Sequence, residues 1–165
     1  RQHFAFKNFA SYDAELWEEI LGNATKYVKE LPCEIYGSDM SAEMVTKSRR
    51  NLGRLSVGRF VKTSVATFTE VKQPSESGVM ISNPPYGERM GEDIDALYEQ
   101  LGDWMKTEMK GFKCSVLSSN MEAYKNLGLR PDRKIKLFNG DLECSFRKYS
   151  IYAGSKRAKF QNNET

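Results

Sequence analysis

Histidine is nearly absent from this sequence, with His3 as its only example. Because Ser-His-Asp triads and most catalytic zinc sites depend on histidine, both are excluded. Cysteine is also scarce, since Cys33, Cys114 and Cys144 are far apart and odd in number. Their spacing predicts neither a disulfide framework nor a metal site. We therefore expect three reduced thiols, a cytoplasmic protein and no bound metal.

Long hydrophobic runs and a strong charge of one sign are missing as well. No apolar run approaches the roughly 18 residues that span a bilayer, so no membrane segment is expected. The first residues show neither an initiator Met nor a signal-peptide pattern, which is typical of the middle of a longer protein. The net charge of +3 is mild, but basic residues cluster at 130–136, 147–148 and 156–159. Such clusters can bind the phosphate backbone of a nucleic acid, or they can simply keep the protein surface solvated.

Strand and helix patterns alternate along the chain. Apolar residues at helical spacing predict helices over 16–31, ended by Pro32, and over 94–105. Ser41 resembles the N-cap of a helix that runs to about Leu52. Strands are expected at 33–38, 59–64, 79–82 and 114–117, with a short helix at 121–127. Asn139-Gly140 between two strand-like runs predicts a terminal hairpin. This order indicates an α/β fold with a mostly parallel sheet and an antiparallel hairpin at one edge.

The motif Asn83-Pro84-Pro85-Tyr86 directly follows a buried strand. Ligands bind at the carboxyl ends of strands in open α/β sheets. The Asn83 side chain and the Pro84 carbonyl are acceptors that can grip the two hydrogens of an aromatic amino group, and the Tyr86 ring can stack on its base. Such a corner favours methylation of a base amine from a methyl sulfonium, by positioning and fixed dipoles rather than a strong base.

The longer motif Asn83 to Arg89 resembles the THUMP-domain bacterial methyltransferases of large-subunit rRNA, which methylate guanine N2 and are often labelled N6-adenine-specific DNA methylases. Three further segments are similar to that family: Phe4-Ala5-Phe6 followed by Trp17, Ile35 to Asp39, and Asn139 to Cys144. The resemblance implies a Rossmann-like class I methyltransferase sheet and S-adenosyl-L-methionine as cofactor. It also implies RNA as the main partner, with DNA as the lesser choice.

The resemblance assigns roles to the cofactor side of the site. Asp39 is expected to accept hydrogen bonds from the ribose hydroxyls, although capping the following helix would explain it too. Met40 would pack beside the adenine, and Asn83 would also touch the cofactor. Ser64 stands where the family usually has Asp, so it offers the adenine amino group a weaker acceptor.

On the substrate side, Tyr86 would stack on the target base. Arg89 would contact the substrate or make a surface salt bridge. The basic residues Arg133 and Lys134 are expected to bind the nucleic acid. Catalysis itself is assigned to Asn83, Pro84, Pro85 and Tyr86.

The family's first strand and its Gly-rich cofactor loop have no counterpart in this sequence. We therefore predict residues 1–157 as part of a methyltransferase catalytic domain, with 158–165 as a flexible tail. The THUMP domain and the cofactor loop would come from the same full-length protein. Guanine-N2 methylation of 23S rRNA is the leading function. N6-adenine methylation of DNA or RNA, and an inactive RNA-binding fragment, remain as alternatives.

Overall fold

The computed structural model describes residues 4–27, 29, 32–85 and 93–152 of the chain. Its helices are α1 (Ala14–Lys26), α2 (Ala42–Leu52) and α3 (Ile94–Glu108), and its strands are β1 (Ile35–Asp39), β2 (Val61–Val65), β3 (Gly78–Ser82), β4 (Phe112–Ser118), β5 (Arg133–Asn139) and β6 (Leu142–Ser150). Short 3₁₀ turns are η1 (Ala5–Asn8), η2 (Ser56–Phe60), η3 (Phe68–Glu70) and η5 (Ala123–Lys125). Within the described ranges, no helix has the length and apolar character needed to cross a membrane.

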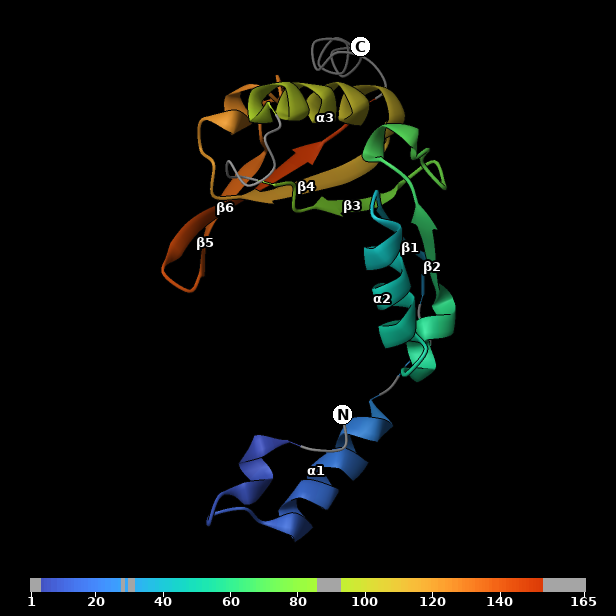
Figure 1. Ribbon diagram of the computed structural model, residues 1–165, viewed down its shortest axis with the longest axis vertical. Coiled ribbons are helices and arrows are strands. Elements are labelled where there is room, and N and C mark those ends of the chain that lie inside the picture. The colour runs from blue at the N-terminus through green and yellow to red at the C-terminus, as the bar shows by residue number, and fades with distance from the viewer. Residues whose placement is uncertain (1–3, 28, 30–31, 86–92, 153–165) are drawn as a thin grey trace, which may run out of the picture.

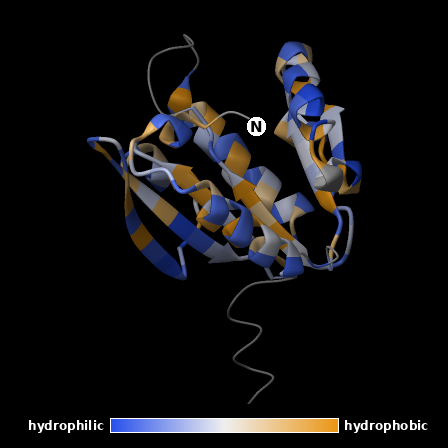
Figure 2. Cartoon of the chain, turned by 90° about the horizontal axis from the view of Figure 1, so that it is seen from below, coloured by the Kyte–Doolittle hydropathy of each residue, from blue (hydrophilic) through white to orange (hydrophobic). Residues whose placement is uncertain are grey.

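Four strands form the larger sheet, in the order β3-β4-β6-β5. β3 pairs with β4 in parallel, while β6 is antiparallel to both β4 and β5. The expected terminal hairpin is therefore confirmed, and its turn contains Gly140 with a φ of +61°, a conformation that favours glycine. Figure 2 shows hydrophobic and hydrophilic residues alternating along β5 and β6, as the two-residue repeat of a strand requires.

The hydrophobic core lies between α3 and one face of this sheet (Figure 1). The helical stripe predicted from the sequence is confirmed, because Tyr98, Leu101 and Met105 are almost completely buried. They pack with Cys114 and Val116 of β4 and with other buried residues of the same cluster. α3 also carries Gly102, where an added Cβ would lie only 2.0 Å from the Leu127 carbonyl oxygen. The close packing of α3 against the segment after η5 therefore requires glycine at this position.

β1 and β2 form a separate, parallel two-stranded sheet, with α2 as the crossover between them. The N-cap predicted at Ser41 is confirmed, since its hydroxyl accepts the Met44 amide at 3.3 Å. Within the described residues, no strand pairing joins this sheet to β3, so β1 and β3 each have an unpaired edge. The described residues also leave the face of β3 turned away from α3 uncovered, since Val79 and Ile81 are each 68% exposed. Parallel strands are normally buried on both faces, so this pair of sheets has room for further structure.

Several predicted boundaries shift. α1 ends at Lys26, before the predicted stop at Pro32, and none of its residues is buried. Among the described residues, its ring–ring contacts are those of Trp17 with Phe4 and Phe6 beside η1, so little packing supports a longer helix. The strand expected at 59–64 occupies Val61–Val65, because Arg59 and Phe60 belong to η2. The helix expected at 121–127 is only the 3₁₀ turn η5, which is followed by Gly128 at a φ of +59°.

Candidate active site

The predicted catalytic motif begins at the carboxyl end of β3. Asn83 follows the last strand residue, Ser82, and its side chain is exposed, whereas Pro84 is buried and Pro85 is exposed. Burial of one proline fixes the path of the turn while the Asn83 amide stays open to a ligand. Tyr86 and Arg89 lie outside the described residues, so their predicted contacts with the base remain predictions.

A buried polar network lies at the end of the neighbouring strand. Ser82 pairs with Val116, so the chain leaving β3 continues at the level of Ser118, the last residue of β4. The buried Ser118 hydroxyl accepts hydrogen bonds from the Tyr98 hydroxyl at 2.6 Å and from the Asn120 amide at 3.0 Å. These bonds fasten α3 and the loop after β4 to the strand that flanks the motif. Sequence reasoning missed them, although a polar Ser118-Ser119-Asn120 run after a buried strand was a signal.

Tyr124 of η5 holds the next pair of strands together. Its hydroxyl lies 2.8 Å from the Val116 carbonyl oxygen of β4 and 2.6 Å from the Ser145 carbonyl oxygen of β6. Burial raises the pKa of Tyr124 well above its usual value, so its hydroxyl stays protonated and donates. The Arg147 guanidinium packs over the ring, 3.7 Å from its centroid. These contacts join β4 and β6 on the α3 side of the sheet.

The predicted cofactor residues lie at the carboxyl ends of the other sheet. One Asp39 carboxylate oxygen, Oδ1, accepts the Ser41 amide at 2.7 Å, so Asp39 helps to hold the turn before α2 while Ser41 is the N-cap. Asp39 is exposed, and no other hydrogen bond to its carboxylate is found among the described residues. Its second oxygen therefore fits a ribose diol. Met40 is 64% exposed, and Ser64 lies within β2 opposite Ser38, one residue before the strand ends.

The predicted substrate residues Arg133 and Lys134 begin β5, and both are exposed. Their side chains point to opposite faces of the sheet, as neighbours on a strand do. The structure therefore does not bring them together at one point. Lys134 shares a face with Arg147, its cross-strand partner, and Arg133 shares the other face with Lys148.

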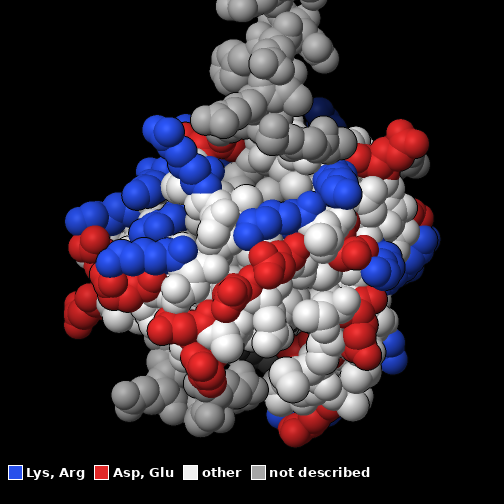
Figure 3. Space-filling view, turned by 90° about the horizontal axis from the view of Figure 1, so that it is seen from above, with Lys and Arg blue, Asp and Glu red and all other residues white. Residues whose placement is uncertain are grey.

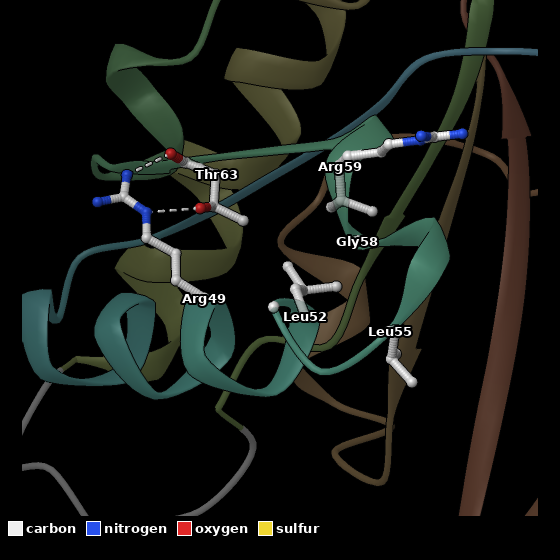
Figure 4. Close-up of a pocket in the computed structure, with 8 residues that line it drawn as sticks. Arg49, Leu52, Leu55, Gly58, Arg59 and Thr63 are labelled. Carbon is white, nitrogen blue, oxygen red and sulfur yellow. Dashed lines mark hydrogen bonds between the residues drawn. The ribbon is translucent and has the colours of Figure 1, made fainter.

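The described surface has a hollow of about 340 Å³ beside α2, η2 and the start of β2 (Figure 4). The Arg49 guanidinium beside it donates to the Thr63 hydroxyl at 2.9 Å and to the Thr63 carbonyl oxygen at 2.6 Å. Because these bonds hold α2 to β2, Arg49 has a structural role. The hollow lies toward the amino end of β2, away from the carboxyl ends where the motif lies.

The cysteines and the possible metal ligands are the last features that the sequence predictions concern. All three cysteines are free, with Cys33 exposed and Cys114 and Cys144 buried. The described part of the chain contains no group of three or more side chains that could hold a metal ion.

Comparison with known proteins gives consistent matches along the chain. Residues 2–148 match the family described as RMKL-like, methyltransferase domain. The Ribosomal RNA large subunit methyltransferase K/L of Shewanella baltica is 37% identical over 163 residues, which cover 95% of this chain and 23% of that protein. The chain thus spans about a quarter of the length of the curated relatives it matches.

Two crystal structures resemble the fold closely. SMU.472, a methyltransferase candidate crystallised with SAH, superposes with a TM-score of 0.78 at 27% identity, covering 93% of this chain and 41% of that one. A methylase candidate from Clostridium difficile 630 gives the same TM-score at 26% identity, covering 94% of this chain and 42% of that one.

Proposed function

Because this chain belongs to the RMKL-like methyltransferase domain family, we propose that it is part of an S-adenosyl-L-methionine-dependent enzyme that methylates an exocyclic amino group of an RNA base. Large-subunit rRNA is the substrate we favour, since it appears in the name of the Shewanella relative, and guanine N2 is the atom. The observation that carries the proposal is the exposed Asn83 amide, held by the buried Pro84 at the carboxyl end of β3.

The reaction requires a poor nucleophile to be aimed at a good electrophile. The amine lone pair of a base is delocalised into its ring, so the Asn83 side-chain oxygen and the Pro84 carbonyl would hold the two amine hydrogens and direct the lone pair outward. S-adenosyl-L-methionine supplies a methyl group activated on a sulfonium. Tyr86 would hold the base by stacking, after the base has left its own stack or where it is already unpaired. Fixed dipoles and positioning account for the rate.

Cofactor binding would use the open side of Asp39. Its free carboxylate oxygen would accept from the ribose hydroxyls, and the exposed Met40 would cover the adenine ring. Ser64 would take the position beside the adenine with its hydroxyl alone. RNA binding would fall to Arg133 and Lys134 of β5, together with Arg89, which lies outside the described residues.

We propose that the rest of the cofactor site comes from another segment of the full-length protein. The unpaired edges of β1 and β3 and the exposed Val79 and Ile81 support a strand and a covering helix between the two sheets. A Gly-rich loop on that segment would complete the site, and a THUMP domain would contribute further RNA affinity. We propose that residues 1–157 belong to the catalytic domain and that the protein works in the cytoplasm. The tail predicted at 158–165 lies outside the described residues.

Two other functions compete with this one. N6-adenine methylation of DNA or RNA would use the same Asn83 to Tyr86 motif, because adenine also presents an amino group. An inactive RNA-binding fragment would keep the basic residues of the hairpin and make no use of Asn83. The exposed Asn83 favours an enzyme over the binding fragment.

The decisive experiment uses the full-length protein with labelled S-adenosyl-L-methionine, and RNA or DNA as acceptor. Mass spectrometry of the digested product is expected to place the methyl group on guanine N2 of RNA. Asn83→Ala should lower single-turnover methylation by on the order of 100-fold or more, because a preorganised polar group is lost. RNA affinity should stay within about two-fold, and Asn51→Ala on α2 is the matched control. Label on adenine N6 would support the first alternative, and unchanged activity in Asn83→Ala would refute the mechanism.

A further inference from the structure

The β5–β6 hairpin reaches past the end of its neighbouring strand. The last pair between β4 and β6 is Ser118 with Ser145, but β5 and β6 stay paired as far as Asn139 with Leu142. β5 runs parallel to β4, so the extra three residues of β5 extend about 10 Å beyond the carboxyl end of β4. The hairpin tip therefore projects from the same edge of the sheet as the Asn83 motif.

An exposed aromatic ring lies at this tip. Phe138 is 65% exposed, and its β5 position places it on the same face of the sheet as Lys134 and Lys136. Its cross-strand partner is Glu143, whose carboxylate is paired with Lys136 at 2.9 Å. That pairing partly neutralises the acidic charge nearest the ring. A single exposed apolar residue needs no explanation, so the charges around this one decide its meaning.

The strands below the tip carry two cross-strand pairs of like charge. Arg133 lies opposite Lys148, and Lys134 lies opposite Arg147. Within the described residues, none of these four side chains takes part in a salt bridge. Like charges directly opposite each other destabilise a sheet. A polyanion on the Phe138 face would relieve the repulsion between Lys134 and Arg147, whereas the Arg133–Lys148 pair lies on the other face. Figure 3 shows basic side chains gathered on the side of the molecule where β5 and β6 lie in Figure 1.

We propose that the β5–β6 hairpin docks single-stranded RNA, with Phe138 stacking on a base that flanks the target and Lys134 holding the backbone. This inference rests on the proposed RNA substrate and adds the residue that positions it. Ser82, Val116, Arg147 and Lys134 form one row across the sheet. Lys134 is three strands from Ser82, or about 14 Å away. Phe138 lies four residues further along β5, so it is about 20 Å from Ser82 and would meet a base several nucleotides from the target.

The test measures RNA affinity and methylation separately in the full-length protein. A short fluorescent single-stranded RNA and the duplex of the same sequence are titrated by fluorescence anisotropy. Phe138→Ala should weaken single-strand binding by roughly 10-fold, since base–aromatic stacking contributes strongly to such sites. Phe138→Trp should restore it, and Phe138→Leu should not. Leu137→Ala, the 42% exposed neighbour on the opposite face, is the matched control and should bind like wild type.

The charge of the hairpin has its own readout. Lys134→Gln should reduce the salt dependence of single-strand binding by about 0.7 in the slope of log K against log salt, the value for one lost phosphate contact. Lys113→Gln, at the amino end of β4, should leave the slope unchanged.

Three results would overturn the inference: Phe138→Ala binding like Leu137→Ala, Phe138→Leu binding like Phe138→Trp, or duplex binding as tight as single strand. A protein that loses RNA affinity in Phe138→Ala but methylates nothing would support the docking surface and refute the proposed function. If the wild-type protein and Phe138→Ala bind and methylate RNA equally well, the proposed function would be supported and the docking surface refuted.

Discussion

Burial separates the three thiols by reactivity. Desolvation raises the pKa of the Cys114 thiol to about 12, while Cys33 is exposed. The reactive species is the thiolate, so at pH 8 only roughly one Cys114 in ten thousand is reactive. Iodoacetamide should therefore label Cys33 in the native full-length protein and reach Cys114 only after unfolding. Peptide mass spectrometry measures both, and fast native labelling of Cys114 would show that the core opens readily.

The raised pKa of Cys114 also makes the stability of the fold depend on pH. An acid whose pKa is higher in the folded state stabilises the fold fully below its unfolded pKa, here about 9.0, and loses that contribution as pH rises toward 12. Stability should thus fall above about pH 9, and Cys114→Ala should flatten the fall. Tyr149, whose pKa burial raises to about 12, adds to the same trend from its usual value of 10.0.

Residue patterns in the sequence predicted the Ser41 N-cap and the position of Asn83 directly after a strand, because each depends only on immediate neighbours. The role of Tyr98 could not be predicted in this way. Its hydroxyl partner, Ser118, is twenty positions away, and a helical stripe shows only that Tyr98 faces the core. Asp39 proved to hold the turn before α2, which leaves one carboxylate oxygen for a ligand.

At the scale of elements, the buried tyrosines Tyr124 and Tyr149 on the α3 side of the sheet differ in the hydrogen bonds of their hydroxyl groups. Tyr124 donates to carbonyls of β4 and β6. Among the described residues, the buried Tyr149 hydroxyl has no hydrogen-bond partner of normal geometry, although Arg147 is nearby. Tyr124→Phe should destabilise the fold by about 1–2 kcal/mol, because a buried acceptor loses its donor. Tyr149→Phe is the matched control and should cost less than about 0.5 kcal/mol. Urea unfolding followed by tryptophan fluorescence compares the two variants, and equal losses would contradict the assignment.

Elements with strong local signals were predicted well. The Asn139-Gly140 turn and the stripe from Ile94 specify the hairpin and α3 through neighbours in sequence. α1 was predicted too long and the segment at 121–127 too helical. The length of a helix depends on what packs against it, which a single sequence does not show.

At the scale of the whole molecule, the pair of sheets is the clearest feature. Among the described strands, β1 and β3 in Figure 1 each have an unpaired edge. Apolar residues of α1 such as Leu16 and Ile20 are about half exposed. Unpaired edges and apolar faces promote self-association. The sequence indicated a gap through the absence of a Gly-rich turn, but the uncovered face of β3 emerged only from the structure.

The isolated 165-residue chain is accordingly expected to bind S-adenosyl-L-methionine weakly or not at all, and to associate with itself. The full-length protein should bind the cofactor and show no association through these edges. Isothermal titration and analytical ultracentrifugation measure the two properties side by side. Low-micromolar cofactor affinity of the isolated chain would show that Asp39 and Asn83 suffice without another segment.

The continuous pairing of β3, β4, β6 and β5 has a geometric consequence. A continuously paired sheet keeps the hairpin tip and the Asn83 motif at a constant separation. The protein would therefore fix the distance along the RNA between the two nucleotides that it contacts. The modified nucleotide would then be chosen by its spacing from the base that Phe138 grips. Adding two residues to each arm of the hairpin, before Phe138 on β5 and after Glu143 on β6, would keep the ring on the same face, move it outward by about 7 Å and change that spacing.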